Sequence, residues 1–172
     1  MTQPAGAHDE SKRSRTFTWE DPLIGAAAAA ELSGLDYLQA MANGALPAPP
    51  LLHTLNMQLE SVEAGIVVFT MTPAEYHYNP IGTVHGGVYS TLLDSAAGCA
   101  VQSLLPAGTA YTSLDLSVRF LRAVRVETGV ITCTGTVRNL GRRTALAEAA
   151  LTSSAGKLLA TATSSCLIFS RH

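Results

Sequence analysis

Charged and aromatic side chains are scarce in this chain of 172 residues, at 14% and 6% of the composition. The formal net charge of −2 lacks the positive excess of a nucleic-acid-binding protein, so we expect no nucleic-acid partner. No apolar stretch is long enough to cross a bilayer, and we expect no membrane partner. The run Gly25–Ala30 is short, follows an acidic segment and lacks the basic flank of a signal peptide.

Cysteine is also rare. Cys99, Cys133 and Cys166 are odd in number and widely spaced, so they form neither a CxxC metal pair nor a disulfide framework. This usage is typical of reduced thiols and predicts a cytoplasmic location. Histidines show no ligand spacing, and we expect no metal site. Four of them are interpreted as structural or tail residues: His8, His53, His77 and His172.

The charges that are present are unevenly distributed along the chain. Residues 1–116 hold 3 Lys/Arg against 11 Asp/Glu, whereas residues 117–172 hold 8 against 2. The C-terminal third is therefore locally basic, with a net charge of about +6. Such a surface could bind an anionic ligand, and scattered charges on solvated strands are an equally open explanation.

Composition divides the chain into three parts. Residues 1–20 are polar and mixed in charge, and we expect a disordered tail. Residues 21–50 predict an N-terminal helix that ends at the C-cap signal Asn43–Gly44, followed by the Pro-rich linker "ALPAPP". Residues 51–172 are expected to form one domain without internal repeats.

A long helix is predicted from about Gly86 to Leu105, where the breaker "PAG" follows. Asp94 is the only charged residue from Val88 to Leu105, so the helix is expected to be buried all round. Two strands joined around residues 63–65 are expected before it, and a four-stranded antiparallel meander after it. The four read TSLDLSVRF, RVETGVITCTGTVRN, RRTALAEAALTSS and LLATATSSCLIFS. About six strands and one helix enclose a core only if the sheet wraps the helix, which predicts such an α+β fold.

Asp94 is the anomaly of this helix. Burying an ionised carboxylate is costly unless it is paired or used, and Asp94 lies too far from the helix N-terminus to benefit from its dipole. It could hydrogen-bond a neighbouring element, such as a partner helix. Alternatively it is a catalytic base or nucleophile, tuned by a dry environment.

The tripeptide His85-Gly86-Gly87 stands where this helix begins. Glycine allows close approach of a backbone N–H, and an N–H at a helix N-terminus is unpaired and electropositive. This combination suits an oxyanion that develops on a carbonyl under attack. A plain glycine-rich turn explains an isolated HGG equally well. The pattern is more specific here because Asn79 precedes His85 by six residues and Asp94 follows it by nine.

Gly86 and Asp94 are separated by eight residues, which on one helix is about 12 Å along the axis. One substrate carbonyl needs its oxyanion donor and its base within hydrogen-bond reach. Two chains whose helices pack antiparallel would bring Gly86 of one to Asp94 of the other. We therefore expect an active site at a two-fold dimer interface, with two sites per dimer.

The segment "NPIGTVHGGVYSTLLDSAAG", the meander after it and the "PAPP" linker before it resemble a hotdog-fold acyl-CoA thioesterase. Within that group the chain resembles the phenylacetate-degradation and 4-hydroxybenzoyl-CoA thioesterase type. The resemblance covers roughly Leu35–Phe169, and the spacing N-x5-HGG-x6-D matches without gaps. It implies a hotdog fold, an antiparallel sheet wrapped around a long central helix. It further implies a homodimer as the minimal unit and a homotetramer built from it.

The resemblance also implies a role for each residue of the pattern. The Gly86 N–H would polarise the thioester carbonyl, and Asn79 would orient the substrate or the lytic water. Asp94 of the partner chain would act as general base or as nucleophile. His85 would fix the loop and hydrogen-bond near the thioester, although a structural loop histidine is an open alternative. Ser113 would lie near the water, or is an ordinary outward strand serine.

Substrate contacts are expected at Gly87 and at the arginines. Arg138, Arg142 and Arg143 surround the turn at Asn139–Gly141, where they could bind the phosphates of coenzyme A. A second candidate group is Arg119, Arg122 and Arg125. Either group could instead form ion pairs between subunits.

The prediction from the sequence is a homo-oligomeric thioesterase that hydrolyses short-chain, medium-chain or aryl acyl-CoA. Coenzyme A enters as part of the substrate, and no cofactor is expected. The 4-hydroxybenzoyl-CoA members often have a threonine one turn after the acidic residue, where this chain has Gly98. Two alternatives stay open: a non-catalytic acyl-CoA-binding module, and a hotdog dehydratase or hydratase.

Overall fold

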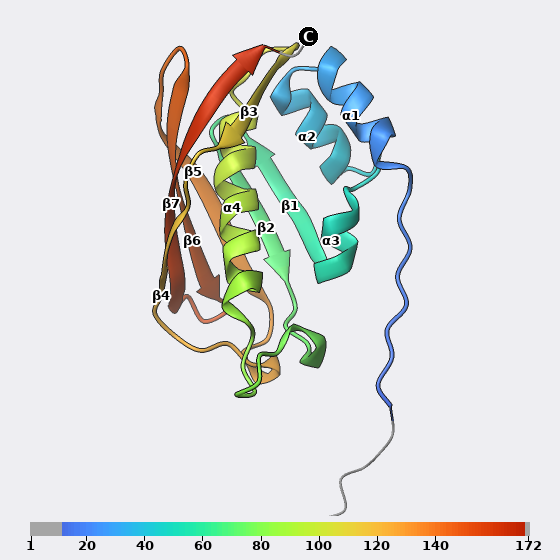
Figure 1. Ribbon diagram of the computed structural model, residues 1–172, viewed down its shortest axis with the longest axis vertical. Helices are drawn as coiled ribbons and strands as arrows, with labels where there is room; N and C mark the ends of the chain where they lie inside the picture. The colour runs from blue at the N-terminus through green and yellow to red at the C-terminus, as the bar shows by residue number, and fades with distance from the viewer. Residues whose placement is uncertain (1–11, 171–172) are drawn as a thin grey trace, which may run out of the picture.

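The computed structural model describes residues 12–170, in which a seven-stranded antiparallel sheet curves around the helix α4, Gly86–Gln102 (Figure 1). The strand order is β1-β2-β5-β6-β7-β3, and β4 also pairs with β7. The strands are β1 Met57–Glu63, β2 Ile66–Met71, β3 Thr109–Ser113, β4 Ser117–Phe120, β5 Ile131–Leu140, β6 Thr144–Ser153 and β7 Leu158–Ser170. The predicted hotdog fold is thereby confirmed.

The expected four-stranded meander after the helix is wrong in its first member. The segment TSLDLSVRF forms two strands, β3 and β4, and both pair with β7 at the far edge of the sheet rather than with β5. Asp115 explains the break between β3 and β4, because its carboxylate and carbonyl accept hydrogen bonds from β7 in place of a regular strand pairing. The Ser165 N–H donates to Asp115 Oδ1 at 3.1 Å, and Ser164 Oγ donates to Asp115 O at 2.8 Å. Only β5, β6 and β7 form a meander.

Other boundaries also differ from the predictions. The strand expected from Arg125 begins at Ile131, after a 3-10 turn η2 at Val126–Thr128. The start of the first expected strand is instead the short helix α3, Pro50–Leu55, because Pro50 fits the first turn of a helix. Helix α4 ends at Gln102, three residues early, and the Leu105 carbonyl accepts a hydrogen bond from the Gly34 N–H at 2.9 Å.

The N-terminal part contains two helices where one was expected. Helix α1, Pro22–Glu31, is separated from α2, Gly34–Ala42, because the Ser33 hydroxyl caps α2 by accepting from the Asp36 N–H at 3.2 Å. The predicted end of the helix at Asn43–Gly44 is confirmed, with Gly44 at φ +79°.

Residues 12–20 carry no helix or strand, yet they contact the folded domain. Arg13 pairs with Glu75 at 2.6 Å, and the Arg15 guanidinium lies 4.3 Å from the centre of the Tyr76 ring. Residues 1–11 of the expected tail, which include His8, lie outside the described residues, as does His172. No helix within residues 12–170 has the length and apolar character needed to cross a membrane.

Helix α4 packs its small residues directly against the sheet. A Cβ added at Gly135 of β5 would lie 2.0 Å from Ala96 O, so glycine is required for this close approach. Burial on all sides, however, was a wrong expectation. Thr91, Asp94 and Ser95 remain partly exposed, because the sheet covers one side of the helix and α2 reaches it only near its C-terminal end. Asp94 therefore lies on a partly exposed polar stripe beside the edge of the sheet.

Candidate active site

The loop before α4 is shaped by the side chain of Asn79. Its Oδ1 accepts from the N–H groups of Ile81 and Thr83, both at 3.1 Å, and its Nδ2 donates to Thr83 Oγ1 at 2.9 Å. The Asn79 N–H also donates to Thr83 O at 2.7 Å. Asparagine is suited to this place because one amide can satisfy both donors and acceptors of a tight turn. The structure therefore places Asn79 as an organiser of the loop that leads to His85.

His85 is the N-cap of α4. Its Nδ1 accepts a hydrogen bond of 2.8 Å from the Gly87 N–H, so Nε2 carries the proton of the neutral ring. The ring is exposed, which leaves this Nε2–H available outside the helix. The Gly87 N–H, expected to contact substrate, is engaged with His85 in this conformation.

The Gly86 N–H is the one donor of this turn that lacks an acceptor within residues 12–170. Gly86 borders a pocket of about 350 Å³, and Asn79 and Arg122 are among its other lining residues. The Phe120 ring covers the glycine closely, since a Cβ added there would lie 3.2 Å from Phe120 Cζ. An unpaired N–H at the positive end of a 17-residue helix is a suitable donor for an oxyanion.

Phe120 and Tyr89 form a wall that the sequence did not indicate. Their rings make an edge contact at 5.7 Å, and the Tyr89 hydroxyl accepts from the Val124 N–H at 2.7 Å. Burial raises the pKa of Tyr89, and the Val124 hydrogen bond opposes that shift. The sequence did not identify either residue as part of the site, because an aromatic side chain within an apolar stretch indicates only core packing.

Asp94 lies on the same helix, two turns beyond Gly86, and is paired with a strand residue. Ser113 Oγ of β3 donates to Asp94 Oδ1 at 2.9 Å, so the structure brings these two expected site residues together. It brings Asn79, His85 and Gly86 together at the start of α4 as a separate group. Within one chain the two groups are about 12 Å apart along the helix.

The cysteines near this helix do not suit nucleophilic catalysis. Burial raises the pKa of Cys99 to about 12, and the nearby Asp94 charge acts in the same direction. Burial likewise raises the pKa of Cys133 to about 12 and raises that of Cys166. Thiolates are the reactive form, so these thiols are inert at neutral pH. Among the described residues, no group of three or more His, Cys, Asp or Glu side chains could hold a metal ion.

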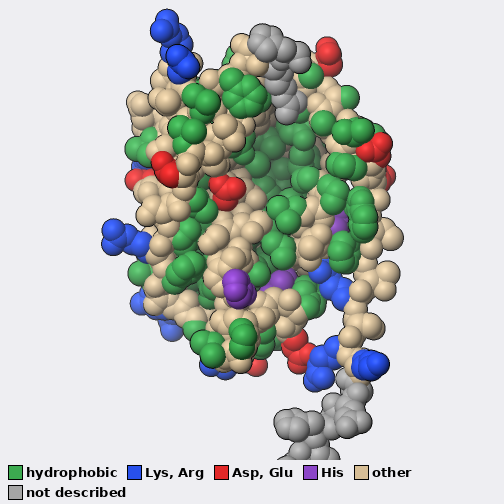
Figure 2. Space-filling view, in the orientation of Figure 1, with side chains coloured by type: hydrophobic (Ala, Val, Ile, Leu, Met, Phe, Trp, Pro, Cys, Tyr) green, Lys and Arg blue, Asp and Glu red, His purple; other side chains and the backbone are tan. Residues whose placement is uncertain are grey.

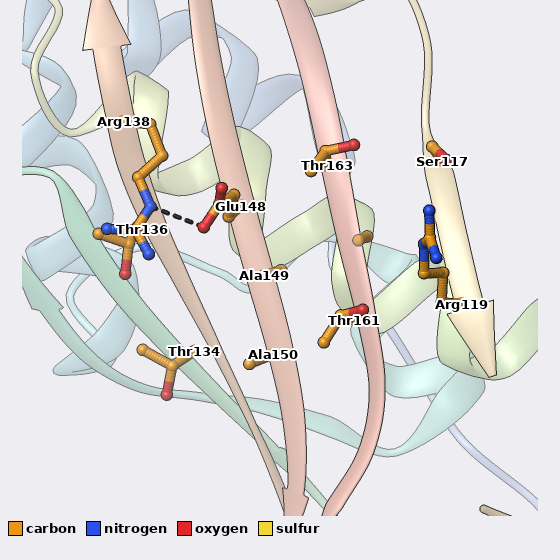
Figure 3. Close-up of a pocket in the computed structure, with 11 residues that line it drawn as sticks. Ser117, Arg119, Thr134, Thr136, Arg138, Glu148, Ala149, Ala150, Thr161 and Thr163 are labelled. Carbon is orange, nitrogen blue, oxygen red and sulfur yellow. Dashed lines mark hydrogen bonds and ion pairs between the residues drawn. The ribbon is translucent and has the colours of Figure 1, made fainter. Parts of the chain in front are cut away.

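The expected arginines are dispersed over the surface. Arg138 lies on the outer face of the sheet, paired with Glu148 at 2.7 Å (Figure 3). It lines a pocket of about 380 Å³ together with threonines of β5 and β7 and with Arg119 of β4. Arg142 and Arg143 border another pocket, with Leu104 and Pro106 at the C-terminal end of α4. Of the six arginines expected to contact coenzyme A, only Arg122 lines the pocket that contains Gly86.

Comparison with known proteins identifies a family. The family profile described as "Thioesterase superfamily" matches residues 81–160. Human acyl-coenzyme A thioesterase 13 is 31% identical over 103 residues, which are 59% of this chain and 72% of that protein. A Halobacterium salinarum protein named as an esterase is 39% identical over 69 residues, 39% of this chain, but the match spans only 44% of that relative's length.

A solved structure supports the same assignment. The phenylacetic acid degradation-related protein of Ralstonia eutropha superimposes with a TM-score of 0.69 at 28% identity, covering 76% of this chain and 98% of that one. The profile match includes Gly86 and Asp94. The chain therefore belongs to the thioesterase superfamily, as the curved sheet, the central helix and these similarities together show.

Proposed function

We propose that this protein hydrolyses the thioester of short-chain, medium-chain or aryl acyl-CoA to the free acid and coenzyme A. The observation that carries the proposal is the Gly86 N–H, which has no acceptor within residues 12–170 and borders a pocket at the N-terminus of α4. The names of two relatives support the substrate class. One is an acyl-coenzyme A thioesterase, and the other is related to phenylacetic acid degradation.

The positions of these groups define the proposed reaction. The Gly86 N–H donates to the thioester oxygen and stabilises the oxyanion, with the exposed His85 Nε2–H as a second donor. The carboxylate of Asp94 from the partner subunit removes a proton from water, whose oxygen attacks the carbonyl carbon. The carbon–sulfur bond then breaks, and the proton passes to the coenzyme A thiolate. Direct attack by Asp94 to form an anhydride, which water then cleaves, gives the same products.

A second copy of the chain is part of the proposal, because one helix separates the two groups by about 12 Å. Asp94 lies on a polar stripe of α4 that is only partly covered by the described residues. The outer edges of β3 and β4 have no strand partner within residues 12–170, and Phe120 at the end of β4 touches Gly86. These features favour a homodimer with shared sites, and we propose a homotetramer built from two such dimers.

Coenzyme A is proposed to enter only as part of the substrate, and we propose no other cofactor and no metal. Arg122 is the arginine that shares a pocket with Gly86, which favours it over Arg138 as a first contact for the phosphates. Arg142 and Arg143 lie near the other end of α4 and would serve only if the substrate extends across the dimer. The three free cysteines support a cytoplasmic location.

The test is release of coenzyme A from a panel of acyl-CoA esters, followed with a thiol reagent. We expect Asp94→Asn to lower kcat by a factor of about 100 or more, because it removes the only proposed base. Glu63→Gln, which alters an exposed carboxylate at the end of β1, is the matched control. Equal activity of Asp94→Asn and the wild type would contradict the mechanism. Tight binding of coenzyme A without turnover of any ester would instead indicate a binding module.

A further inference from the structure

An extended N-terminal arm, residues 12–20, lies beside the helix α3 and contacts the 3-10 turn η1, Glu75–His77 (Figure 1). Figure 2 shows Lys and Arg side chains gathered where the arm meets the domain. The Arg13–Glu75 ion pair is open to solvent, with side-chain exposures of 69% and 62%, so it contributes little to holding the arm. Within the arm, Arg15 is the one residue that is partly buried.

The Arg15 guanidinium caps the C-terminal end of α3. Its Nη1 donates to the Thr54 carbonyl, and its Nη2 donates to the His53 carbonyl. The last carbonyls of a helix lack their usual partners within the helix, and the fixed fork of a guanidinium can satisfy two of them together. The same group lies over the Tyr76 ring of η1, 4.3 Å from its centre. One side chain therefore joins the arm to both α3 and η1.

These two elements hold the loop at the start of the proposed active site. The Leu55 carbonyl, at the end of α3, lies 2.9 Å from His77 Nε2 of η1. The His77 carbonyl in turn accepts a hydrogen bond of 2.8 Å from the His85 N–H. His85 directly precedes Gly86, and the peptide group between them carries the Gly86 N–H. The direction of that N–H therefore depends on how firmly His85 is held.

We propose that Arg15 is a positioning residue for the Gly86 N–H and acts through α3 and His77. The proposal rests on the proposed function, because it takes this N–H as the oxyanion donor. Such a donor acts only at the correct distance and direction, and a small displacement lowers the rate of the chemical step. Loss of the Arg15 contacts frees the end of α3, which loosens the support of His77 and then of His85.

The kinetic test compares Arg15→Gln and Arg15→Lys on the acyl-CoA ester that the wild type hydrolyses fastest. We expect Arg15→Gln to lower kcat about 10-fold and to change KM less than about twofold, because a misplaced donor weakens the transition state rather than substrate binding. Arg15→Lys keeps the charge and can donate to one carbonyl at a time, so its kcat should lie between those of the wild type and Arg15→Gln.

Lys12→Gln is the matched control, since it makes the same change of charge in the same arm. Lys12 has no hydrogen bond or ion pair within residues 12–170, and its replacement should leave kcat and KM unchanged. A higher KM with an unchanged kcat in Arg15→Gln would overturn the proposal, because Arg15 would then contribute to substrate binding instead.

Hydrogen exchange tests the same connection without any turnover. The His85 amide is protected while its hydrogen bond to the His77 carbonyl is intact. Exchange followed by mass spectrometry on the full chain should be about 10-fold faster in peptides within residues 77–87 of Arg15→Gln, the effect of one weakened hydrogen bond. Peptides from β5 and β6 should exchange at the wild-type rate, and Lys12→Gln should match the wild type throughout.

Two exchange results would overturn the proposal. Unchanged exchange in the loop of Arg15→Gln would show that Arg15 is not coupled to His85. Equal acceleration in the loop and in the sheet would show a general loss of stability instead. Both results can be read even if no ester is hydrolysed. Faster exchange confined to the loop, in a protein that turns over no ester, would contradict the proposed function and confirm that Arg15 holds the loop.

Discussion

Ser113 Oγ donates a hydrogen bond of 2.9 Å to Asp94 Oδ1, which ties the edge of the sheet to the central helix. The bond holds one carboxylate oxygen in place, and the other oxygen has no hydrogen-bond partner within residues 12–170. In the proposed mechanism Asp94 is a base that meets substrate from another subunit, and it needs this fixed orientation because misplacement of a reacting group strongly lowers the rate. We therefore propose Ser113 as a positioning residue for Asp94.

Removing the Ser113 hydroxyl should impair catalysis more than stability. We expect Ser113→Ala to lower kcat about 10-fold with little change in KM, because a hydrogen bond to a charged group contributes about 1.5 to 3 kcal/mol. Stability should change little, since the half-exposed carboxylate regains water. Steady-state kinetics and thermal unfolding measure both effects. Ser117→Ala, on the outer face of β4, is the matched control. A larger effect in Ser117→Ala would show that the loss is not specific to the Asp94 contact.

The role of the Gly86 N–H can be tested by deleting that group alone. Gly86 is the first residue of α4, where proline is tolerated, and His85 at φ −64° and ψ 139° already has the conformation that precedes proline. We expect Gly86→Pro to lower kcat by about 100-fold or more, the usual effect of losing an oxyanion donor.

Gly86→Ala is the matched control for this substitution, because it adds a Cβ against Phe120 but keeps the N–H. It should retain most of the activity, since Phe120 is 56% exposed and can move aside. Circular dichroism should show an intact fold for both variants. If the alanine and proline variants lose the same activity, crowding against Phe120 rather than the N–H would be the cause.

Shared sites predict complementation between inactive variants. Mixing Gly86→Pro and Asp94→Asn chains and allowing subunits to exchange should restore about a quarter of the wild-type activity. Half of the dimers are then mixed, and each mixed dimer contains one intact site out of two. Absence of recovery, with exchange verified by mass spectrometry of tagged chains, would place both groups of one site in a single chain.

His77 supports the loop that precedes α4 and is only 2% exposed. Its Nδ1 accepts from the Ala74 N–H at 3.0 Å, its Nε2 lies 2.9 Å from Leu55 O, and its carbonyl accepts from the His85 N–H at 2.8 Å. The neutral ring with a proton on Nε2 satisfies all of these contacts. A second proton on Nδ1 would face the Ala74 N–H and break that bond.

Stability should therefore fall in acid because of His77. Burial lowers the pKa of His77 from 6.5, the hydrogen bond to the Leu55 carbonyl opposes this shift, and the Arg15 charge adds to it. Below pH 6.5 the unfolded chain therefore binds more protons at His77 than the folded chain does. The contribution of His77 to stability is complete above pH 6.5 and is lost as the pH falls through the pKa of His77 in the folded state. Urea unfolding from pH 7.5 to 5 should show a smaller decline in His77→Gln than in the wild type. His53→Gln, at a partly exposed position of α3, should show the wild-type decline.

The sequence alone determined the architecture through local signals. The period of two in the strands, the apolar run after His85 and the breaker at Pro106 depend on neighbouring residues, so they can be read along the chain. The same holds for the cap at Asn43–Gly44 and for the HGG pattern with Asn79 and Asp94 at fixed distances. Even the need for a second chain follows from the rise of one helix, and it stays a prediction.

Only the tertiary structure decided which elements and side chains meet. The order of strands at the edge depends on Asp115, whose hydrogen bonds to β7 join residues about 50 positions apart. The pairing of Ser113 with Asp94, and of Tyr111 with Gly98, likewise depends on the register of β3 against α4. Periodicity shows which residues share a face, but it does not show which partner that face will meet. The partial exposure of the stripe around Asp94 also depends on the tertiary structure, because long-range packing sets how far a sheet wraps around a helix.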